Sequence, residues 1–419
     1  MQRITERRNR DARFPCFNSS SGIHLRHEKQ DLSPNYLYTG IPGRHRKRFQ
    51  LFPFFFMTFM PTISPLSGMA EPPVSVMFAV TSSWLIPLAV AIRSLCVHSD
   101  PRRNYELHIV HHGLEEEQMK ELGKAVSSYP RVSLGFCRLP ERLLRILQHR
   151  DCGRFSPLTY GRLLAAALFP RHDRVVYLDV LLNGDVAELY DADLHGAPIG
   201  AVRDCAVLQS ISTGRLPDHL EYISGMGVTN PRLYCNTGVM VMDLVQMREQ
   251  ETEDRLLRLL EAHPDSFPYV DQDIINIVFH GRIAPLPLRW NYHFQFELHH
   301  AGMADLISGT EFEEAPALFE SRSWKLFHLV GDYKPWLPPD MEKIYHRLYL
   351  ALWWPLARQT PAFRRELRAL YRQFTRAFRS RLRHHQWSLP VSPGRNFRKR
   401  REKIKTLQRQ LAVFDGSWP

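Results

Sequence analysis

Strands and helices alternate along this chain from residue 74 onward, and this alternation restricts the possible folds more than any other feature. Short apolar runs rich in β-branched residues, typical of buried strands, begin at residues 74, 105 and 132. The segments between them, 86–98 and 115–129, have the periodicity of helices. A further helix is predicted over 156–169, with Ser156 as its N-cap and Pro157 at its first position. A strand–helix–strand order predicts parallel strands joined by right-handed crossovers. We therefore predict an α/β domain built around a mostly parallel central sheet.

The positive charge of the chain is concentrated at its two ends. The net charge is +12 over 419 residues, but basic residues outnumber acidic ones by seven in 1–70 and by fourteen in 351–419. The residues between these ends are therefore net acidic. With the change in composition, this division predicts an extension over 1–70, a globular domain over 71–340 and a basic helical tail over 341–419.

The first 70 residues show no sustained strand or helix period and are rich in Arg, Ser and Pro. We expect a disordered extension, or a stretch upstream of a true start at Met69. A membrane anchor is the alternative, because a basic run at 44–48 precedes an apolar run at 51–60. That run is about ten residues long, whereas a membrane-spanning helix needs roughly twenty.

Six cysteines are scattered along the chain without a CxxC pair or the spacing of a zinc site. Most of them lie within apolar strings, which predicts buried free thiols in a reducing compartment. They are Cys16, Cys96, Cys137, Cys152, Cys205 and Cys235.

The tail 341–419 contains an amphipathic helix that is rich in arginine. Its apolar positions recur at helical spacing, and arginines occupy the opposite face; the apolar residues are Phe363, Leu367, Tyr371, Phe374 and Phe378. Such a helix suits a surface of anionic lipids. Two alternatives are a helix packed on the domain with a solvated Arg face, and a nucleic-acid binder. No recognisable nucleic-acid-binding motif accompanies the arginines, so no nucleic-acid partner is expected.

One apolar strand ends in an acid. The run Val-Val-Tyr-Leu at 175–178 is followed directly by Asp179, and an Asn-Gly-Asp turn follows at 183–185. Ligands of α/β proteins bind at the carboxyl ends of such strands. A carboxylate there is placed to bind Mg²⁺ or Mn²⁺, which prefer oxygen ligands. Asp185 fits a cap or turn that leads into the next helix.

Three further segments combine polar side chains with a predicted strand or helix end. Asn-Thr-Gly at 236–238 opens an apolar strand and suggests amide contacts with a polar ligand. Asp-Gln-Asp at 271–273 opens a helix, in which Asp271 fits the N-cap and the packed acids would also hold sugar hydroxyls. The pattern His-x-x-Gly-x-x-Lys at 328–334 could supply a metal ligand, a close backbone approach and a positive charge for phosphate. A buried structural role is the alternative for its histidine.

Taken in this order, the four segments resemble glycosyltransferase family 8, and in particular its bacterial lipopolysaccharide glycosyltransferases. The resemblance covers about residues 74–340 and includes Tyr-Gly-Arg-Leu at 160–163. It implies a GT-A fold that binds a nucleotide sugar. It also implies transfer of the sugar from a UDP-sugar with retention of anomeric configuration, with Mn²⁺ (or Mg²⁺) as cofactor.

The resemblance also implies roles for individual residues. Asp179 and His328 match metal ligands, and Gly331 and Lys334 match the contacts to the diphosphate. The residues that match the donor-sugar site or lie near the donor are Arg162, Asp204, Asn236, Thr237, Asp271 and Gln272. Gln272 matches the residue at the reacting face, and with Asp271 it is expected to act in catalysis.

Two positions depart from the family pattern. The usual strand end is close to YLDxDxxxxGD, whereas YLDVLLNGD at 177–185 is two residues shorter and has one acid in place of two. The turn after the first strand usually carries an acid and a Tyr that hold the uracil. Here it is Thr-Ser-Ser-Trp at 81–84, so Trp84 is expected to stack on the base.

The sequence therefore predicts a hexosyltransferase. It would move glucose or galactose from UDP-glucose or UDP-galactose to a saccharide or a lipid-linked oligosaccharide, in the synthesis of lipopolysaccharide or another cell-surface glycan. We expect a cytoplasmic protein, peripheral on the inner face of the cytoplasmic membrane. The alternative is a catalytically impaired relative that binds a sugar nucleotide without efficient turnover. The absence of GxGxxG and GxxxxGK[ST] argues against the usual dinucleotide and P-loop sites.

Overall fold

The computed structural model of the chain describes residues 71–141, 144, 157–179, 181–214, 217–263, 267–293, 308–331, 334–337, 344–388 and 394–412. Two compact units divide the chain, Met1–Phe56 and Met57–Pro419, and every described residue belongs to the second. The predictions for 1–70, including the start at Met69 and the alternative anchor, fall outside the described residues.

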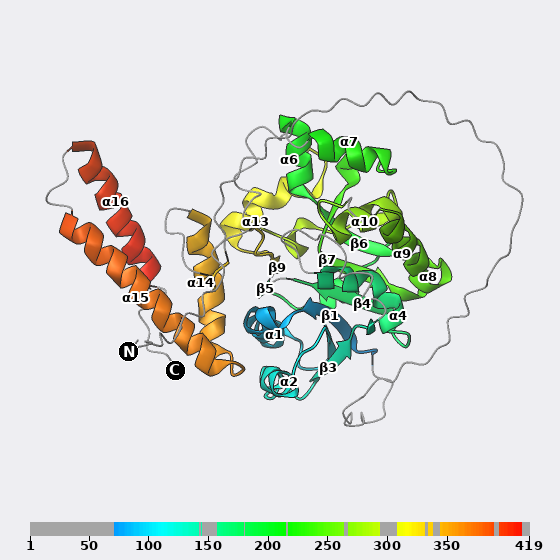
Figure 1. Ribbon diagram of the computed structural model, residues 1–419, viewed down its shortest axis with the longest axis horizontal. Coiled ribbons are helices and arrows are strands. Elements are labelled where there is room, and N and C mark those ends of the chain that lie inside the picture. The colour runs from blue at the N-terminus through cyan, green and yellow to red at the C-terminus, as the bar shows by residue number, and fades with distance from the viewer. Residues whose placement is uncertain are drawn as a thin grey trace, which may run out of the picture. The chain divides into compact units, whose positions relative to one another are not determined.

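A seven-stranded sheet forms the centre of the protein (Figure 1). Its strands are β1 (Val74–Val80), β2 (Tyr105–His111), β3 (Val132–Arg138), β4 (Arg174–Leu178), β6 (Ile199–Arg203), β7 (Cys235–Asp243) and β8 (Ile283–Pro285). They lie in the order β3-β2-β1-β4-β7-β6-β8. Only β7 runs against the others, since its pairings with β4 and β6 are antiparallel and the remaining pairings are parallel. The predicted α/β fold with a mostly parallel sheet is confirmed.

Alternate residues of the strands enter two apolar cores on opposite faces of the sheet. In β4, Val176 and Leu178 belong to the core on the side of α1 (Leu85–His98), and Val175 and Tyr177 belong to the other. A strand that is buried on both faces reads as a continuous apolar run. This is why the sequence identifies β4 as a buried strand.

Helices cover both faces and complete the domain. Those between the strands are α2 (Glu116–Gly123), α4 (Ala165–Leu168), α5 (Ala187–Tyr190), α6 (Cys205–Thr213), α7 (Pro217–Gly225), α8 (Leu244–Glu249), α9 (Thr252–Ala262), α10 (Asp271–Val278) and α13 (Ala315–Ser321). A second, two-stranded sheet pairs β5 (Leu181–Leu182) with β9 (Leu326–Phe327). This pairing fixes β9, and with it the predicted metal ligand His328, beside the chain that leaves β4.

The segment predicted as one helix over 156–169 is different in the structure. Pro157–Leu164 forms a 3-10 helix, and only Ala165–Leu168 (α4) is α-helical. The 3-10 helix packs against β2 at Gly161, where an added Cβ would lie 3.4 Å from Val110 Cγ1. Within the 3-10 helix, Arg162 Nε donates to Thr159 O at 3.1 Å, which turns the guanidinium into the protein.

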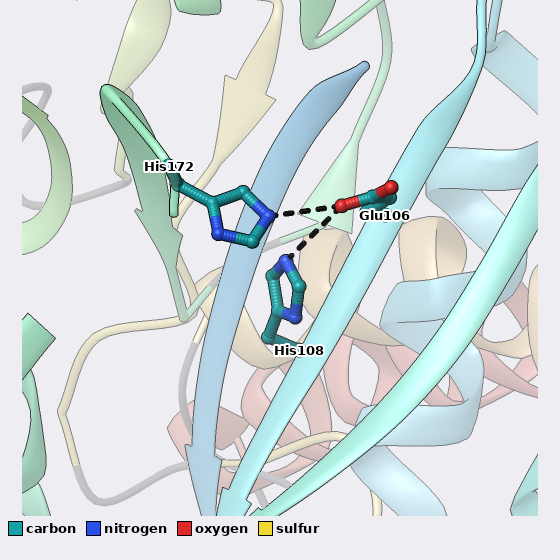
Figure 2. A group of neighbouring side chains, drawn as sticks. All are labelled: Glu106, His108 and His172. Carbon is teal, nitrogen blue, oxygen red and sulfur yellow. Dashed lines mark hydrogen bonds and ion pairs between the residues drawn. The ribbon is translucent and has the colours of Figure 1, made fainter. Parts of the chain in front are cut away.

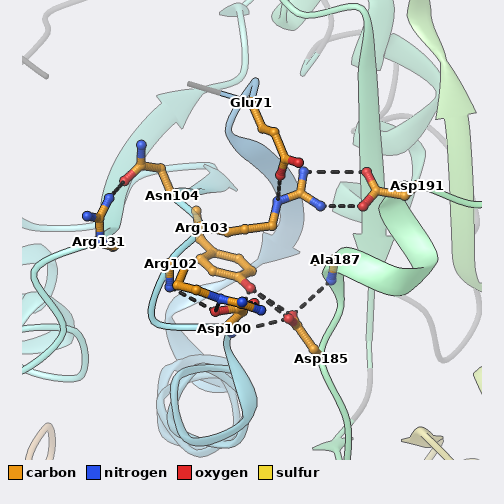
Figure 3. Close-up of polar contacts among 10 residues, drawn as sticks. Glu71, Asp100, Arg102, Arg103, Asn104, Arg131, Asp185, Ala187 and Asp191 are labelled. Atoms are coloured by element: carbon orange, nitrogen blue, oxygen red, sulfur yellow. Dashed lines mark hydrogen bonds and ion pairs between the residues drawn. The ribbon is translucent and has the colours of Figure 1, made fainter. Parts of the chain in front are cut away.

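Asp185 lies in a polar network near the start of β2, away from the end of β4 (Figure 3). Its carboxylate accepts hydrogen bonds from Tyr105 Oη at 2.8 Å and from the backbone nitrogen of Asp100 at 3.1 Å. It also accepts one from the backbone nitrogen of Ala187 at 3.0 Å, at the start of α5. The prediction that Asp185 caps a turn is therefore confirmed.

Free thiols are found at the four cysteines that the structure describes, as predicted. Cys96, Cys205 and Cys235 are buried, and Cys137 is half-buried. Burial raises the pKa of the Cys137 thiol to about 11 and that of Cys96 to about 12. These thiols are therefore protonated and unreactive near neutral pH.

The basic tail folds as helices that share the core of the domain. They are α14 (Ile344–Gln359), α15 (Arg364–Ser388) and α16 (Gly394–Leu411). The predicted apolar stripe of α15 is buried, with Leu367 and Phe378 fully inaccessible, and it packs with Trp353 and Trp354 of α14. Protein therefore covers the face that was expected to meet lipid, and the exposed face carries the arginines. In the described part of the chain, no helix has both the length and the apolar content needed to cross a membrane.

Phe374 tests this packing. Replacing Phe374, which is 2% exposed, with Ala removes a ring that contacts Trp354. We expect the free energy of unfolding to fall by about 3–5 kcal/mol in denaturant titrations. Gln373→Ala, at an exposed position of the same helix, should stay within about 0.5 kcal/mol of the original protein. Equal effects of the two changes would mean that the apolar face of α15 is not covered in solution.

Candidate functional site

Polar ends of three adjacent strands meet at one edge of the sheet. Asp179 follows β4, Asp204 follows β6, and Asn236 is the second residue of β7. Because β7 is antiparallel to both neighbours, its beginning lies at the same edge as their carboxyl ends. The sheet order thus brings together three residues that are far apart in the sequence.

Asp179 is exposed to solvent, but protein surrounds its carboxylate on several sides. Its backbone nitrogen donates to Gly238 O at 3.0 Å, which continues the pairing of β4 with β7. The surrounding protein raises the pKa of Asp179, and the cations Lys334 and Arg162 oppose that rise. The carboxylate therefore lies where a cation would be favourable.

His328 packs against the backbone of β7 at the same place. A Cβ added to Gly238 would lie 2.2 Å from His328 Cε1, so only glycine leaves room for the imidazole. The backbone nitrogen of His328 donates to Tyr292 O at 2.7 Å, which fixes the chain just after β9. Asp179 and His328, the two predicted metal ligands, thus both lie against Gly238, the first through its backbone and the second through its ring.

A chain of amide hydrogen bonds determines which nitrogen of His328 carries the proton. Asn236 Oδ1 accepts from the backbone nitrogen of Gly238 at 3.0 Å and from Asn291 Nδ2 at 2.9 Å. Asn291 therefore directs its Oδ1 to His328 Nδ1, at 2.9 Å, and Nδ1 must be the donor. The lone pair of a neutral ring then lies on Nε2, the tautomer that a metal ligand requires.

Burial lowers the pKa of His328 well below its ordinary value, and the nearby His293, Lys334 and Arg162 lower it further. The ring is consequently neutral at physiological pH. A neutral imidazole and a carboxylate are a suitable donor pair for a divalent cation. Among the described residues, no third His, Cys, Asp or Glu joins this pair as a ligand. The other coordination positions would have to come from a substrate or water.

Gln272 and Asp204 form a second polar group beside Asn236. Gln272 Oε1 accepts from the backbone nitrogen of Thr237 at 3.2 Å, and its Nε2 donates to Asp204 Oδ2 at 3.2 Å. Asn236 Nδ2 donates to the same Asp204 oxygen at 3.0 Å. The other oxygen of Asp204 caps α6 by accepting from Ala206 and Val207. Three elements therefore set the orientation of Gln272: its own helix α10, β7 through Thr237, and the start of α6 through Asp204.

Arg162 and Asp271 form a buried ion pair behind this group. Arg162 Nε lies 3.1 Å from Asp271 Oδ2, and both side chains are almost completely inaccessible. Arg162 Nη1 also donates to Thr237 O at 2.6 Å, and the guanidinium lies 3.9 Å from the ring centre of Tyr177. The two predicted donor contacts, Arg162 and Asp271, thus lie together and engage each other. A pair this enclosed positions its neighbours rather than presenting free charge.

The expectation that Asp271 caps α10 is wrong. The preceding residue, Val270, holds the cap position with a positive φ of 49°, and the Asp271 side chain turns to Arg162 instead. Asp273, the second acid, is fully buried and accepts from Tyr234 Oη at 2.6 Å and from the backbone nitrogen of Tyr269 at 2.8 Å. Each residue of the Asp-Gln-Asp segment therefore has different partners. Asp271 pairs with Arg162, Gln272 binds Thr237 and Asp204, and Asp273 binds Tyr234 and Tyr269.

An aromatic and cationic surface lies where β1 ends. Trp84 is 39% exposed, its ring lies 5.6 Å from that of Trp336, and Lys334 Nζ lies 5.9 Å from the Trp84 ring centre. Lys334 also donates to the backbone oxygen of Leu329. Gly331 has a φ of 82°, which other residues rarely adopt. The predicted base-stacking and diphosphate residues are thus neighbours.

Sequence reasoning missed Asn291 and the roles of Tyr177 and Tyr234. In the sequence Tyr177 is simply part of an apolar strand, but its ring lies under Arg162. Tyr234 precedes β7 and donates to Asp273. Asn291 lies 55 positions from Asn236 and 37 from His328. No spacing in the sequence signals its contact with either residue.

The sequence profile of Glycosyl transferase family 8 matches residues 75–338. This chain belongs to that family. The matched region begins in β1, ends just after Trp336 and includes every residue of the site.

Curated relatives are distant in sequence but cover the same region. Glycosyltransferase GlyF of Streptococcus pneumoniae is 23% identical over 282 residues, which are 67% of this chain and 60% of the relative. Lipopolysaccharide 1,2-glucosyltransferase of Escherichia coli K12 is 25% identical over 268 residues, 62% of this chain and 72% of that enzyme. The chain thus spans less than two thirds of the pneumococcal relative.

A solved structure confirms the fold. The galactosyltransferase LgtC, in complex with donor and acceptor sugar analogs, aligns with a TM-score of 0.55 and 20% identity, covering 71% of this chain and all of that one. The sheet order, the family and this alignment together establish the GT-A type fold that the sequence resemblance implied.

Arg162→Met should destabilise the protein in a way that depends on pH. Burial raises the pKa of Asp271 and Arg162 opposes this, so removing Arg162 raises the pKa further. The folded state then holds a proton that the unfolded state has released, and stability falls as pH rises. We expect a loss of about 3–5 kcal/mol near pH 8 that becomes smaller near pH 5, measured by denaturant unfolding.

Arg171→Met is the matched control, because Arg171 is an exposed arginine in the same stretch of chain, between α4 and β4. Its unfolding free energy should stay within about 0.5 kcal/mol of the original protein at both pH values. A cost for Arg162→Met that is the same at pH 5 and pH 8 would contradict the ion-pair interpretation.

Proposed function

We propose that this protein is a retaining hexosyltransferase. It transfers glucose or galactose from UDP-glucose or UDP-galactose to a saccharide or lipid-linked saccharide, in lipopolysaccharide or other cell-surface glycan synthesis. The observation that carries the proposal is the meeting of Asp179 and His328 at Gly238, next to the cation Lys334. A carboxylate, a neutral imidazole and an ammonium group together suit a metal–diphosphate complex.

Asp179 and His328 would hold the divalent ion, Mn²⁺ or Mg²⁺. When bound, the ion supplies positive charge that neutralises the diphosphate as it leaves the sugar. Asn291 supports His328 in this role, because it keeps the proton on Nδ1 and the lone pair on Nε2. Lys334 adds a second positive charge near Asp179. Stabilising the leaving diphosphate is the main electrostatic requirement of the reaction.

Trp84 and Gly331 would bind the rest of the nucleotide. The half-exposed Trp84 ring offers a face for stacking on uracil, and its contact with Trp336 holds it in position. Gly331 has no side chain, so a diphosphate could approach its backbone closely, and its positive φ favours glycine at this position. These contacts support a nucleoside diphosphate sugar as the donor.

Asp204, Asn236, Thr237 and Gln272 would bind the sugar, with Gln272 at the reacting face. Each amide or carboxylate already has a fixed partner, so the group is oriented before any substrate arrives. Preorganised polar groups lower the cost of reorganisation during the reaction. Asp271 and Arg162 act from behind, since both bind Thr237 and neither side chain is exposed. Front-side attack and a covalent intermediate are both compatible with retention.

The basic tail would hold the protein at the membrane that carries a lipid-linked acceptor. Exposed arginines of α15 would bind anionic headgroups by charge alone, since the apolar face of that helix is buried. This contact would keep the protein at the inner face of the cytoplasmic membrane, where lipid-linked acceptors are assembled. The relative named as a lipopolysaccharide 1,2-glucosyltransferase supports this class of acceptor.

The alternative is a relative that binds a sugar nucleotide without efficient turnover. The shortened strand end favours it. The next acid after Asp179 in the chain is Asp185, and its carboxylate binds Tyr105 at the start of β2 and the backbone of Asp100, so it does not replace the missing acid. Losing a carboxylate ligand weakens metal binding by more than about tenfold if it contributes a few kcal/mol.

Turnover of UDP-glucose and UDP-galactose, with and without Mn²⁺, separates the two proposals. We expect release of UDP that depends on the metal and falls at least about a hundredfold in Asp179→Asn, since the charge that holds the ion is lost. Asp193→Asn, at an exposed acid away from the site, should leave the rate unchanged. Donor binding without any turnover at saturating Mn²⁺ would reject the active enzyme. Inserting an x-Asp pair after Asp179 should then restore activity.

Binding to vesicles tests the tail. We expect the protein to sediment with anionic vesicles at low salt and to be released as salt increases, because the contact is electrostatic. Changing Arg368, Arg372 and Arg379 to Gln should weaken this binding by about 1 kcal/mol per arginine. The matched control changes Arg171, Arg232 and Arg255, which are exposed elsewhere, to Gln. Equal binding by both triple variants would contradict the proposal.

A further inference from the structure

A second cluster of metal-ligating side chains lies within the domain. Glu106 and His108 project from the same face of β2, and His172 comes from the turn between α4 and β4 (Figure 2). Across the described ranges, this is the one place where three His, Cys, Asp or Glu side chains bring ligand atoms within 4.8 Å of one another. The proposed transferase chemistry uses none of these residues.

The three ligand atoms converge at distances close to those of a metal site. His172 Nε2 lies 2.9 Å from Glu106 Oε2, and His108 Nε2 lies 3.9 Å from the same oxygen. Zn²⁺ binds His nitrogen and carboxylate oxygen at about 2.0–2.2 Å, so ligand atoms around one ion are about 3.0–3.5 Å apart. Small side-chain rotations would bring all three atoms onto one ion.

The hydrogen bonding of the cluster is incomplete. His108 Nε2 is buried and has no hydrogen-bond partner among the described residues. An unmade hydrogen bond at a buried nitrogen is costly, and a metal ion would satisfy it. Burial, with a smaller contribution from His172, lowers the pKa of His108 to about 4. Phe169 packs on both imidazoles and holds their planes.

The register of the sheet separates this cluster from the proposed donor site around Asp179. His108 is level with Tyr177, because both pair with Met77 of β1. Asp179 is two residues further along, and Glu106 is two residues back. The cluster therefore lies about 7–13 Å from the level of Asp179 along the strands. The whole of β1 lies between β2 and β4.

We infer that Glu106, His108 and His172 bind a divalent transition-metal ion of the Zn²⁺ class, with water at the remaining position. Two imidazoles and one carboxylate suit Zn²⁺ better than Mg²⁺ or Ca²⁺, which prefer all-oxygen sites. Glu106 is 36% exposed and His172 is 21% exposed, so an ion can enter from solvent. The bound ion joins β2 to the turn that leads into β4, the strand that carries Asp179.

Zinc binding by the full-length protein tests this inference. Metal-free protein is titrated with Zn²⁺ against a competing chelator, and Co²⁺ replaces Zn²⁺ to report coordination by its visible absorption. We expect one site with a Kd below about 1 µM. His108→Gln and Glu106→Gln should each weaken it at least about tenfold. Glu106→Gln keeps the shape of a half-exposed residue, so a folding defect is not expected to explain its result.

Two controls distinguish the cluster from other sites. His328→Gln removes the imidazole at the proposed donor site and should leave this Zn²⁺ affinity unchanged. His195→Gln removes an exposed histidine that also lies beside a carboxylate, that of Asp193, and should likewise have no effect. Unfolding of each metal-free variant in denaturant verifies that the protein is folded.

Three results would overturn the inference. They are no Zn²⁺ binding tighter than about 10 µM, retention of tight binding in both His108→Gln and Glu106→Gln, or loss of the site in His328→Gln. The last result would place the ion at the Asp179–His328 edge. The expected pattern is loss of binding in the two cluster variants and its retention in both controls.

Discussion

The buried ion pair between Arg162 and Asp271 holds together the elements around the proposed donor site, at the edge of the sheet where β4 and β6 end. Arg162 reaches the 3-10 helix through Thr159, β7 through Thr237, α10 through Asp271 and β4 through the ring of Tyr177. A charge taken out of water is tolerated only when it is paired and hydrogen-bonded. The four elements therefore have little freedom to move separately. Thr237 is the connection to the site, since its backbone nitrogen holds Gln272 and its backbone oxygen holds Arg162.

From this frame, polar contacts extend to the proposed metal site through amide groups. Gln272 and Asn236 share Asp204, Asn236 holds Asn291, and Asn291 sets the tautomer of His328. Networks of this kind couple their members, because a change in one amide alters what the next can accept. The residues proposed to bind the sugar and those proposed to bind the metal are thus parts of one hydrogen-bonded system rather than two independent groups.

The sequence was sufficient for the fold and for the segments that the structure brings together at one edge of the sheet, and physical reasons explain its failures. Val175–Leu178 could be predicted as a strand because burial on both faces leaves a continuous apolar run. Asp271 was assigned as a cap because local rules ignore a buried arginine 109 positions earlier. The helix predicted over 156–169 is a 3-10 helix over most of its length, a distinction that apolar periodicity does not make. The roles carried over for the site residues, and the domain boundary near residue 340, stay predictions.

The stripe on α15 shows a different limit. Periodicity reports that one face of a helix is apolar, but lipid and protein satisfy that face equally well. Only the packing of Trp354 of α14 against Tyr371 and Phe374 of α15 decides between them. Asn291 marks a further limit, because contacts among residues far apart in the chain leave no periodic trace in the sequence around any of them.

The way α14–α16 close the core has a consequence for biosynthesis. One continuous apolar core contains Val74 at the start of β1 and Leu407 in α16, more than three hundred positions later. Chains leave the ribosome from the amino end, and domains tend to fold in that order. The core around β1 is therefore incomplete until α16 has been synthesised. The nascent chain therefore carries uncovered aromatic and aliphatic surface through most of its synthesis, a period in which chaperones would have reason to bind it.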